Sequence, residues 1–295
     1  MTVQATTPPA RSIVSDYIAL TKPRIISLLL VTAIGGMFLA AQGLPDAATV
    51  AVVLVGGYLA AGGAHALNHY LERDIDGMMR RTSRRPVVSG RVTPTNALVF
   101  GVALNVIAFV LLSSFVNVLS ATITLTGTLI YIFVYTIGLK RVTPQNIVIG
   151  GAAGAVPPMV GWTAITGSLD LPALYLFAII FFWTPPHFWA LAILIKDDYV
   201  RAGIPMLPVV SSLENTKQSI LLYTVLLTAL TVMFFVTGAV GGIYLASTTV
   251  LGGLFIYFAY RFLRAQGVKG ARSLYLYSLL YLDLLFLAIM IDSVV

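Results

Sequence analysis

Long apolar runs separated by short polar segments make up most of the chain. Each run is close to the ~20 residues that a helix needs to cross a hydrocarbon core of about 30 Å. Eight runs contain no Lys, Arg, Asp or Glu, and the ninth contains only Asp283. The runs lack the strict alternation of membrane β-strands and are about twice as long. We therefore predict an all-α integral membrane protein with nine transmembrane helices, at residues 25–43, 49–70, 96–115, 118–138, 146–166, 172–195, 219–237, 243–260 and 274–291.

The composition agrees with a membrane location. Only 10% of the 295 residues are charged and 58% are hydrophobic, whereas about 25% of the residues in soluble domains are charged. The net charge of +7 does not indicate nucleic-acid binding, because the basic residues lie in short loops between apolar runs. The absence of Cys excludes disulfides, thiolate metal sites and covalent c-type haem attachment. The segment before Lys22 is polar or mixed and resembles neither a signal peptide nor a transit peptide, so residues 1–24 are expected to form a cytoplasmic tail.

The basic residues predict the orientation. All 18 Lys and Arg residues lie in the N-terminal segment and in the loops after the second, fourth, sixth and eighth runs. Nine spans place these segments on one side, so the N-terminus should be cytoplasmic and the C-terminus outside. The two longest inner loops, 71–95 and 196–218, follow helices four positions apart. This spacing suggests two four-helix units plus a final helix, arranged around a central cavity.

Some positions inside the predicted spans are unusual for a membrane helix. Pro157-Pro158 and Pro185-Pro186 should bend or break the fifth and sixth helices. Asp283 is expected to be a buried charge that bonds to a neighbouring helix or lines the cavity.

Three oxygen-bearing side chains follow one another at the end of the second run. Asn68, Glu72 and Asp76 are spaced i, i+4 and i+8, so on a helix they share one face. Carboxylate and amide oxygens suit Mg²⁺, which binds one or two carboxylates together with substrate phosphates. The alternative is a solvated helix end with incidental acids. Asp197 and Asp198, after the sixth run, could complete the site, although an Asp pair at a helix end is common.

Arginines follow the acidic stripe directly. Their planar side chains bind phosphate oxygens in pairs, so acids for a metal beside arginines for phosphate predict a diphosphate site. The alternative is a topology signal that also contacts anionic lipids. The cluster comprises Arg80, Arg81, Arg84 and Arg85.

All three histidines lie inside predicted spans. His65 and His69 share the stripe of Glu72, and His187 lies 11 residues before Asp198. If both helices are regular, each carries acids at the inner mouth and histidine two to three turns deeper, roughly 10–16 Å into the membrane. Histidines at such depth are functional candidates, although hydrogen bonding between helices is an equal alternative.

The chain resembles the intramembrane aromatic prenyltransferases of the UbiA superfamily. The resemblance rests on Asn68-xxx-Glu72-xxx-Asp76 and on Asp198-Tyr199. Thr184-Pro185-Pro186-His187-Phe188-Trp189 and residues 202–208 are closer to the branch that prenylates haem than to relatives acting on quinone or chlorophyll precursors. His69 stands where the superfamily usually has Asp, which fits that branch.

The second motif also departs from the usual Asp-xxx-Asp pattern. Arg201 and Ala202 stand four residues after Asp197 and Asp198. The resemblance therefore implies no ligand set for a second metal ion.

The resemblance implies transfer of a farnesyl group from farnesyl diphosphate to a vinyl group of haem b, giving haem O and diphosphate for terminal oxidases. It also implies a bacterial plasma membrane location and a possible handover to a haem A synthase or to terminal oxidase assembly. The expected Mg²⁺ ligands are Asn68, Glu72, Asp76 and Asp198, which together with Arg73 form the catalytic set. The expected diphosphate-binding residues are Arg80, Arg81, Arg85, Lys196 and Tyr199, and the expected haem-binding residues are His187, His65 and His69.

Two other functions stay open. One is prenyl transfer to another aromatic acceptor such as 4-hydroxybenzoate, which would leave the histidines without a role. The other is a transporter with a cationic inner mouth, although two polar motifs on one side favour a one-sided active site over alternating access.

Overall fold

The computed structural model describes residues 12–295, and this part of the chain is helical, without a β-strand. It contains nine helices long and apolar enough to cross a membrane, which confirms the predicted number of spans. The first four are α2 (Pro23–Ala41), α3 (Ala47–Leu71), α5 (Pro94–Phe115), and α6 (Val118–Leu129) continued by the π-helix η1 (Ile130–Leu139). The fifth comprises α7 (Asn146–Gly150), η2 (Gly151–Ala153) and α8 (Val156–Thr166). The last four are α9 (Leu171–Leu194), α12 (Leu213–Phe234) with η3 (Phe235–Thr237), α13 (Gly242–Arg264) and α14 (Ala271–Asp292).

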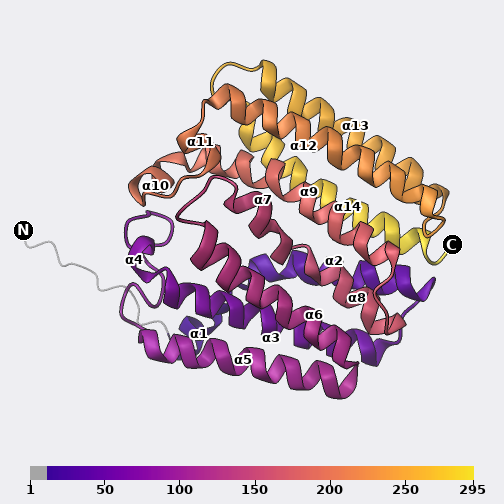
Figure 1. Ribbon diagram of the computed structural model, residues 1–295, viewed down its shortest axis with the longest axis horizontal. Helices are drawn as coiled ribbons and strands as arrows, with labels where there is room; N and C mark the ends of the chain where they lie inside the picture. Colours follow the sequence, from indigo (N-terminus) through magenta and orange to yellow (C-terminus); the bar gives the residue numbers. More distant parts are fainter. Residues whose placement is uncertain (1–11) are drawn as a thin grey trace, which may run out of the picture.

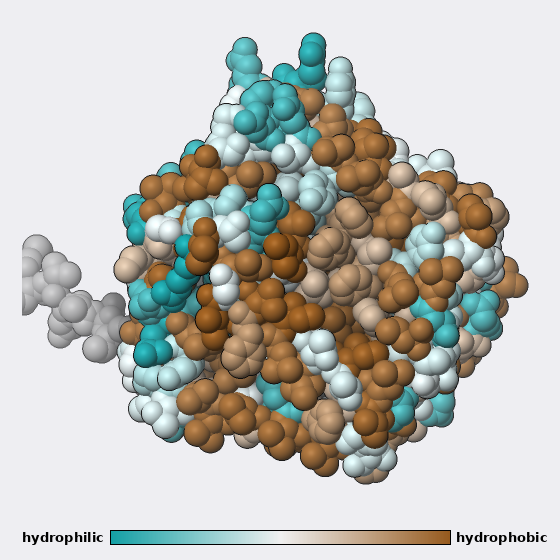
Figure 2. Space-filling view, viewed as in Figure 1, coloured by the Kyte–Doolittle hydropathy of each residue, from teal (hydrophilic) through white to brown (hydrophobic). Residues whose placement is uncertain are grey.

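Four short helices lie outside the spans. They are α1 (Ile13–Thr21), α4 (Arg73–Asp76), α10 (Lys196–Arg201) and α11 (Leu207–Val210). All four lie toward one end of the bundle, and the C-terminus lies at the opposite end (Figure 1). Hydrophobic side chains cover most of the middle of the face in Figure 2, while hydrophilic ones gather toward the end that carries the short helices. Arg11, one of the basic residues of the N-terminal segment, lies outside the described residues, as does the rest of 1–11.

Local side chains determine where several helices begin. Asp46 accepts a hydrogen bond from the backbone N–H of Thr49 at 2.8 Å, and Asn117 accepts one from Ser120 at 2.8 Å. Thr93 and Ser212 cap α5 and α12 in the same way. Such caps satisfy backbone donors that the first helical turn leaves free. These capping residues are polar and lie between the apolar runs, so the apolar runs in the sequence mark the spans well.

Small residues allow helices from the two halves of the chain to pack closely. A Cβ at Gly36 on α2 would collide with the carbonyl of Pro158, and one at Gly161 on α8 would collide with the carbonyl of Ala33. Glycine at both positions therefore lets α2 and α8 approach backbone to backbone, a common device in membrane helix pairs. Helix α14 packs against α2 as well as α9 and α13, so the last span of the chain lies beside the first.

The two proline pairs behave differently. Pro157-Pro158 lies in the first turn of α8, just after the break that separates α8 from η2. Pro185-Pro186 lies inside α9, which runs from Leu171 to Leu194, so of the two expected effects, a bend or a break, the break does not occur. The sixth helix breaks instead at Ile195, whose φ of −120° ends α9 before α10 begins. The regular helical continuation that would place His187 and Asp198 on one face is therefore absent.

Asp283 is not buried, which corrects a second expectation. Its side chain lies on the exposed face of α14 with Leu280, Leu284 and Leu287, while Leu282 and Phe286 occupy the packed face. Because α14 is apolar on all sides, its sequence does not reveal which face meets the bundle.

Candidate functional site

The acidic stripe lies where the second span leaves the bundle. Helix α3 ends at Leu71, Glu72 interrupts the helix, and α4 follows directly. The backbone N–H of Glu72 donates to the Asn68 carbonyl at 2.9 Å, and that of Asp76 donates to the Glu72 carbonyl at 2.8 Å. The i, i+4 connection therefore survives the interruption. The side chains of Asn68, Glu72 and Asp76 are all buried.

Basic side chains from distant segments hold two residues of this stripe. Lys140, just after η1, pairs with the Glu72 carboxylate. Lys22, between α1 and α2, donates from Nζ to Asn68 Oδ1 at 3.1 Å. In the sequence both lysines indicate only the topology. Their position at the inner ends of spans, level with the acidic stripe, is the signal that could have identified them.

Arginines hold the other two predicted metal ligands. Arg85 donates to Asp76 Oδ2 at 2.6 Å, and Arg201 pairs with Asp198. The backbone N–H of Arg80 also donates to Asp198 Oδ1 at 3.2 Å. This last contact joins the loop after α4 to α10, so the structure brings the first and second inner motifs together.

Burial and these partners shift the acidity of the carboxyl groups in different directions. Burial alone raises the pKa of Glu72, but the paired ammonium of Lys140, together with the charges of Lys22 and Arg85, outweighs it, so the pKa of Glu72 is lowered. Burial raises the pKa of Asp76, and Arg85 offsets only part of that effect. Desolvation also opposes ionisation of Asp198, but the backbone N–H groups of Arg80 and Arg81 and the Arg201 guanidinium lower its pKa overall.

Other predicted diphosphate residues lie at the surface. Arg80, Arg81 and Lys196 have exposed side chains at the same end of the bundle. Arg73 points away from the stripe, donating to the Tyr70 carbonyl at 2.6 Å and lying 4.7 Å from the centre of the Tyr70 ring.

Tyr199, next to Asp198, is buried. It packs with Ile75 and Met79 of the first inner loop. This contact is a second connection between the two motifs.

The oxygen-rich stripe is chemically suited to Mg²⁺. Within residues 12–295 no three His, Asp or Glu side chains are already arranged to hold a metal ion. The carboxylates of Glu72, Asp76 and Asp198 each pair with a basic side chain. Asp76 Oδ1 is nevertheless buried without a hydrogen-bond partner in the described chain. An unpaired carboxylate oxygen in the protein interior is costly, and a hard cation satisfies it. The residues therefore fit the ion, provided that it replaces some of the basic partners.

The three histidines have different surroundings. His187 on α9 has Nδ1 2.8 Å from Ser278 Oγ, and its ring stacks on Trp183 at 4.3 Å. His65 Nδ1 is 3.5 Å from the Tyr131 hydroxyl, a distance too long for a strong hydrogen bond. Both ring nitrogens of His69 are buried and lack a partner in the described chain.

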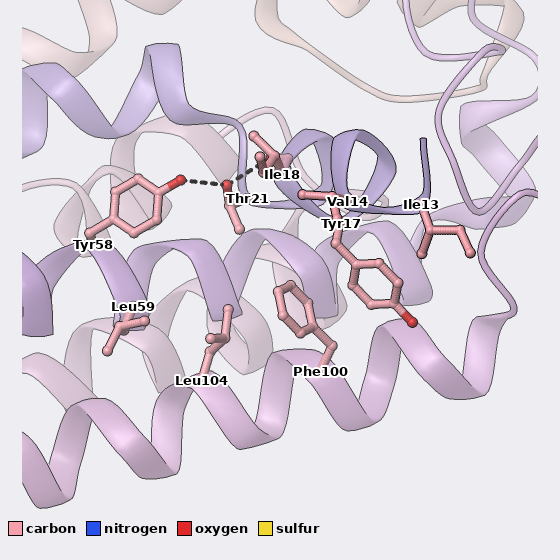
Figure 3. Close-up of a pocket in the computed structure, with 9 residues that line it drawn as sticks. All are labelled: Ile13, Val14, Tyr17, Ile18, Thr21, Tyr58, Leu59, Phe100 and Leu104. Carbon is pink, nitrogen blue, oxygen red and sulfur yellow. Dashed lines mark hydrogen bonds between the residues drawn. The ribbon is translucent and has the colours of Figure 1, made fainter. Parts of the chain in front are cut away.

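An apolar groove lies apart from all these residues. It has a volume of about 330 Å³ and is lined by side chains of α1, α3 and α5, as Figure 3 shows. Two hydrogen bonds of Thr21 Oγ1 lie along it, one of 3.0 Å with the Tyr58 hydroxyl and one of 2.8 Å to the Ile18 carbonyl. None of the predicted site residues lines it.

A nine-span helical bundle with joined acidic and basic motifs at one end has the architecture of an intramembrane prenyltransferase. Residues 29–287 match the UbiA prenyltransferase family, and the chain belongs to that family. Among solved structures, a digeranylgeranylglyceryl phosphate synthase has the same fold, with a TM-score of 0.79 and 18% identity over 96% of this chain and 99% of the other. A UbiA homolog from Archaeoglobus fulgidus bound to DMAPP and Mg²⁺ gives a TM-score of 0.64 at 16% identity, covering 93% and 99% of the two chains.

Curated relatives are more similar in sequence. A protein named Protoheme IX farnesyltransferase from Roseiflexus sp. (strain RS-1) is 51% identical over 284 residues, covering 96% of this chain and 53% of the relative. The chain thus spans about half the length of that relative. The protein of the same name from Gloeobacter violaceus is 48% identical over 288 residues, covering 97% of this chain and 94% of the relative.

Proposed function

We propose that this chain transfers the farnesyl group of farnesyl diphosphate to a vinyl group of haem b, giving haem O and diphosphate. The observation that carries the proposal is the union of the two inner motifs through the contact between Arg80 N–H and Asp198. This union gathers acids and bases at one end of helices that carry His65, His69 and His187 farther along. The names of the similar curated proteins support the same reaction.

The proposed reaction breaks the allylic C1–O bond, the π bond of the vinyl group and one O–H bond of water, and it forms one carbon–carbon and one carbon–oxygen bond. The allylic C1–O bond of farnesyl diphosphate breaks, and the oxygen leaves with both electrons as diphosphate. The vinyl group of haem b then forms a bond to C1, which moves the positive charge onto the carbon attached to the porphyrin. Water adds to that carbon and loses a proton, so one water is consumed for each haem O formed. An apolar interior guards the farnesyl cation against water until the carbon–carbon bond exists.

The basic side chains of the site would bind the leaving diphosphate. Lys22, Lys140, Arg85 and Arg201 now hold Asn68, Glu72, Asp76 and Asp198. We propose that they turn toward the diphosphate oxygens when the substrate arrives, while the exposed arginines at the mouth attract it. Fixed cations beside the departing oxygen stabilise the charge that develops as the C1–O bond breaks.

Asn68, Glu72, Asp76 and Asp198 would hold Mg²⁺. When bound, this ion supplies positive charge that neutralises the diphosphate and makes it a better leaving group. The buried Asp76 Oδ1 without a partner supports this assignment. The Mg²⁺ in the Archaeoglobus fulgidus homolog supports the choice of metal.

Haem b would bind deeper, with a histidine on its iron so that a vinyl edge faces C1. We favour His187, because its ring is oriented by Ser278 and Trp183. The orientation in the membrane belongs to the same proposal: a cytoplasmic N-terminus, an outer C-terminus and a bacterial plasma membrane. Handover of haem O to a haem A synthase or to terminal oxidase assembly would follow.

One experiment separates this function from its rivals. Purified protein in lipid nanodiscs is incubated with Mg²⁺ and radiolabelled farnesyl diphosphate, with haem b or 4-hydroxybenzoate as acceptor. We expect labelled haem O and diphosphate only with haem b, and none after chelation of the metal. Label in the benzoate product would indicate the other acceptor class. A protein that binds the diphosphate without ever releasing it from the prenyl chain would contradict a transferase altogether.

A further inference from the structure

The ring of His187 is held from the last helix of the bundle. Its Nδ1 lies 2.8 Å from Oγ of Ser278 on α14, 91 positions later in the chain. The same Oγ lies 2.6 Å from the backbone carbonyl of Tyr275. Ser278 is fully buried. The serine hydroxyl is thus placed between an imidazole nitrogen and a carbonyl oxygen.

The positions of these atoms determine which nitrogen of His187 carries the proton. A carbonyl oxygen only accepts, so the single hydroxyl proton of Ser278 is donated to Tyr275. The Oγ must then accept the proton of His187 Nδ1. A neutral imidazole has one N–H, so Nε2 keeps a free lone pair.

Aromatic neighbours fix the direction of the ring. Trp183 stacks on His187 with 4.3 Å between ring centres and 18° between planes, and Tyr275 lies at 5.0 Å. The Trp183 indole N–H donates to the Ser278 carbonyl at 2.7 Å, which ties α9 to the same turn of α14. Within residues 12–295, His187 Nε2 makes no hydrogen bond to protein. A ring with one nitrogen anchored and the other free is the arrangement of a metal-binding histidine.

We infer that Ser278 is a positioning residue for the haem substrate: it holds His187 as the Nδ1–H tautomer and leaves Nε2 to bind the haem iron. This inference rests on the proposed function. It also distinguishes the three histidines, because His65 has only a long contact to Tyr131 and His69 has no partner within the described chain. The hydrogen bond to Ser278 further makes Nε2 a stronger electron donor.

The test compares haem binding by variants of the full chain in nanodiscs. Haem b is titrated into wild type and Ser278→Ala, and the affinity, absorption spectrum and midpoint potential of the bound haem are measured. We expect Ser278→Ala to weaken haem binding about tenfold and to raise the midpoint potential, because the ligand loses basicity. Farnesyl diphosphate affinity should not change. Ser273→Ala is the matched control, since Ser273 lies exposed on the same helix, and it should match wild type throughout.

The same change in a His187→Ala background shows whether Ser278 acts through the histidine. In that background we expect Ser278→Ala to cause no further change in haem affinity. An equal loss of haem affinity in both backgrounds overturns the inference. If Ser278→Ala does not fold, Ser278→Cys decides, because the thiol is similar in size but a weaker acceptor. If a Ser278 variant binds haem with the spectrum, affinity and midpoint potential of the wild type, the inference about Ser278 is wrong, while the proposed function is unaffected. A wild type that binds no haem overturns the proposed function with it.

Discussion

Lys140 and Glu72, 68 residues apart in the sequence, form a buried ion pair at the inner end of the bundle. Neither charge has much access to water, so each is stable there mainly because of the other. The pair connects the end of η1 to the end of α3. In the proposed reaction Glu72 would exchange this partner for Mg²⁺, and Lys140 would exchange it for diphosphate.

We expect Glu72→Gln to abolish turnover while the protein stays folded. The amide keeps the size of the side chain and an oxygen that accepts from Lys140, but it removes the charge needed for the metal. Labelled haem O formation measures turnover, and a thermal melt checks the fold. Asp74→Asn is the control, because the Asp74–Arg141 pair is exposed two residues away, and its turnover should be unchanged. Retained turnover in Glu72→Gln would mean that the carboxylate holds no metal.

The stability of the protein should depend on pH through Glu72. Its pKa is lowered in the folded chain, so the ionised pair stabilises the fold above the ordinary glutamate pKa of about 4.3. That contribution is lost as the pH falls through the lowered value. Asp76, whose pKa is raised, acts in the opposite direction. The informative measurement is therefore the difference in melting temperature between wild type and Glu72→Gln at pH 7 and near pH 3.5. The advantage of wild type should shrink in acid, and a constant difference would contradict the assignment.

His187→Ala and Asp198→Ala should fail in different ways. His187→Ala should lose haem affinity or change the haem spectrum while farnesyl diphosphate affinity stays within about twofold. Asp198→Ala should keep the haem spectrum and lose metal-dependent diphosphate binding, because Asp198 lies at the mouth beside Arg80 and Arg201. Separate titrations of the two substrates measure both effects. An unchanged haem spectrum and affinity in His187→Ala would transfer the ligand role to His65 or His69.

Asp283→Leu should leave turnover unchanged. Asp283 lies on the exposed face of α14 among leucines, and no ion pair or hydrogen bond involves its side chain within residues 12–295. A charged side chain near the middle of a span costs a few kcal/mol on insertion, so the variant should be at least as abundant in membranes. Quantitative blotting and the haem O assay measure the two outcomes. A large loss of turnover would give Asp283 a role that its position does not explain.

The candidate site could be predicted from the sequence where its geometry is local. Asn68, Glu72 and Asp76 are brought together by helical spacing alone, and their backbone connections persist across the interruption at Glu72. The relation between His187 and Asp198 was also inferred from spacing, but the uninterrupted helix that it assumed is absent, because α9 ends before Ile195. Tertiary contacts decide where such a helix is interrupted, and the residues of an apolar stretch do not indicate that position.

The sequence by itself determined the membrane class, the nine spans and the family, because apolar length and local motifs are properties of contiguous residues. Only the tertiary structure decided which charges meet. Lys140 reaches Glu72 and Ser278 reaches His187 across 68 and 91 residues, and such pairings depend on how uniformly apolar helices rotate and pack. For the same reason the sequence left Asp283 apparently buried. Hydrophobicity drives all nine helices into the membrane, whereas the close packing of small residues such as Gly36 and Gly161 selects the faces that turn inward.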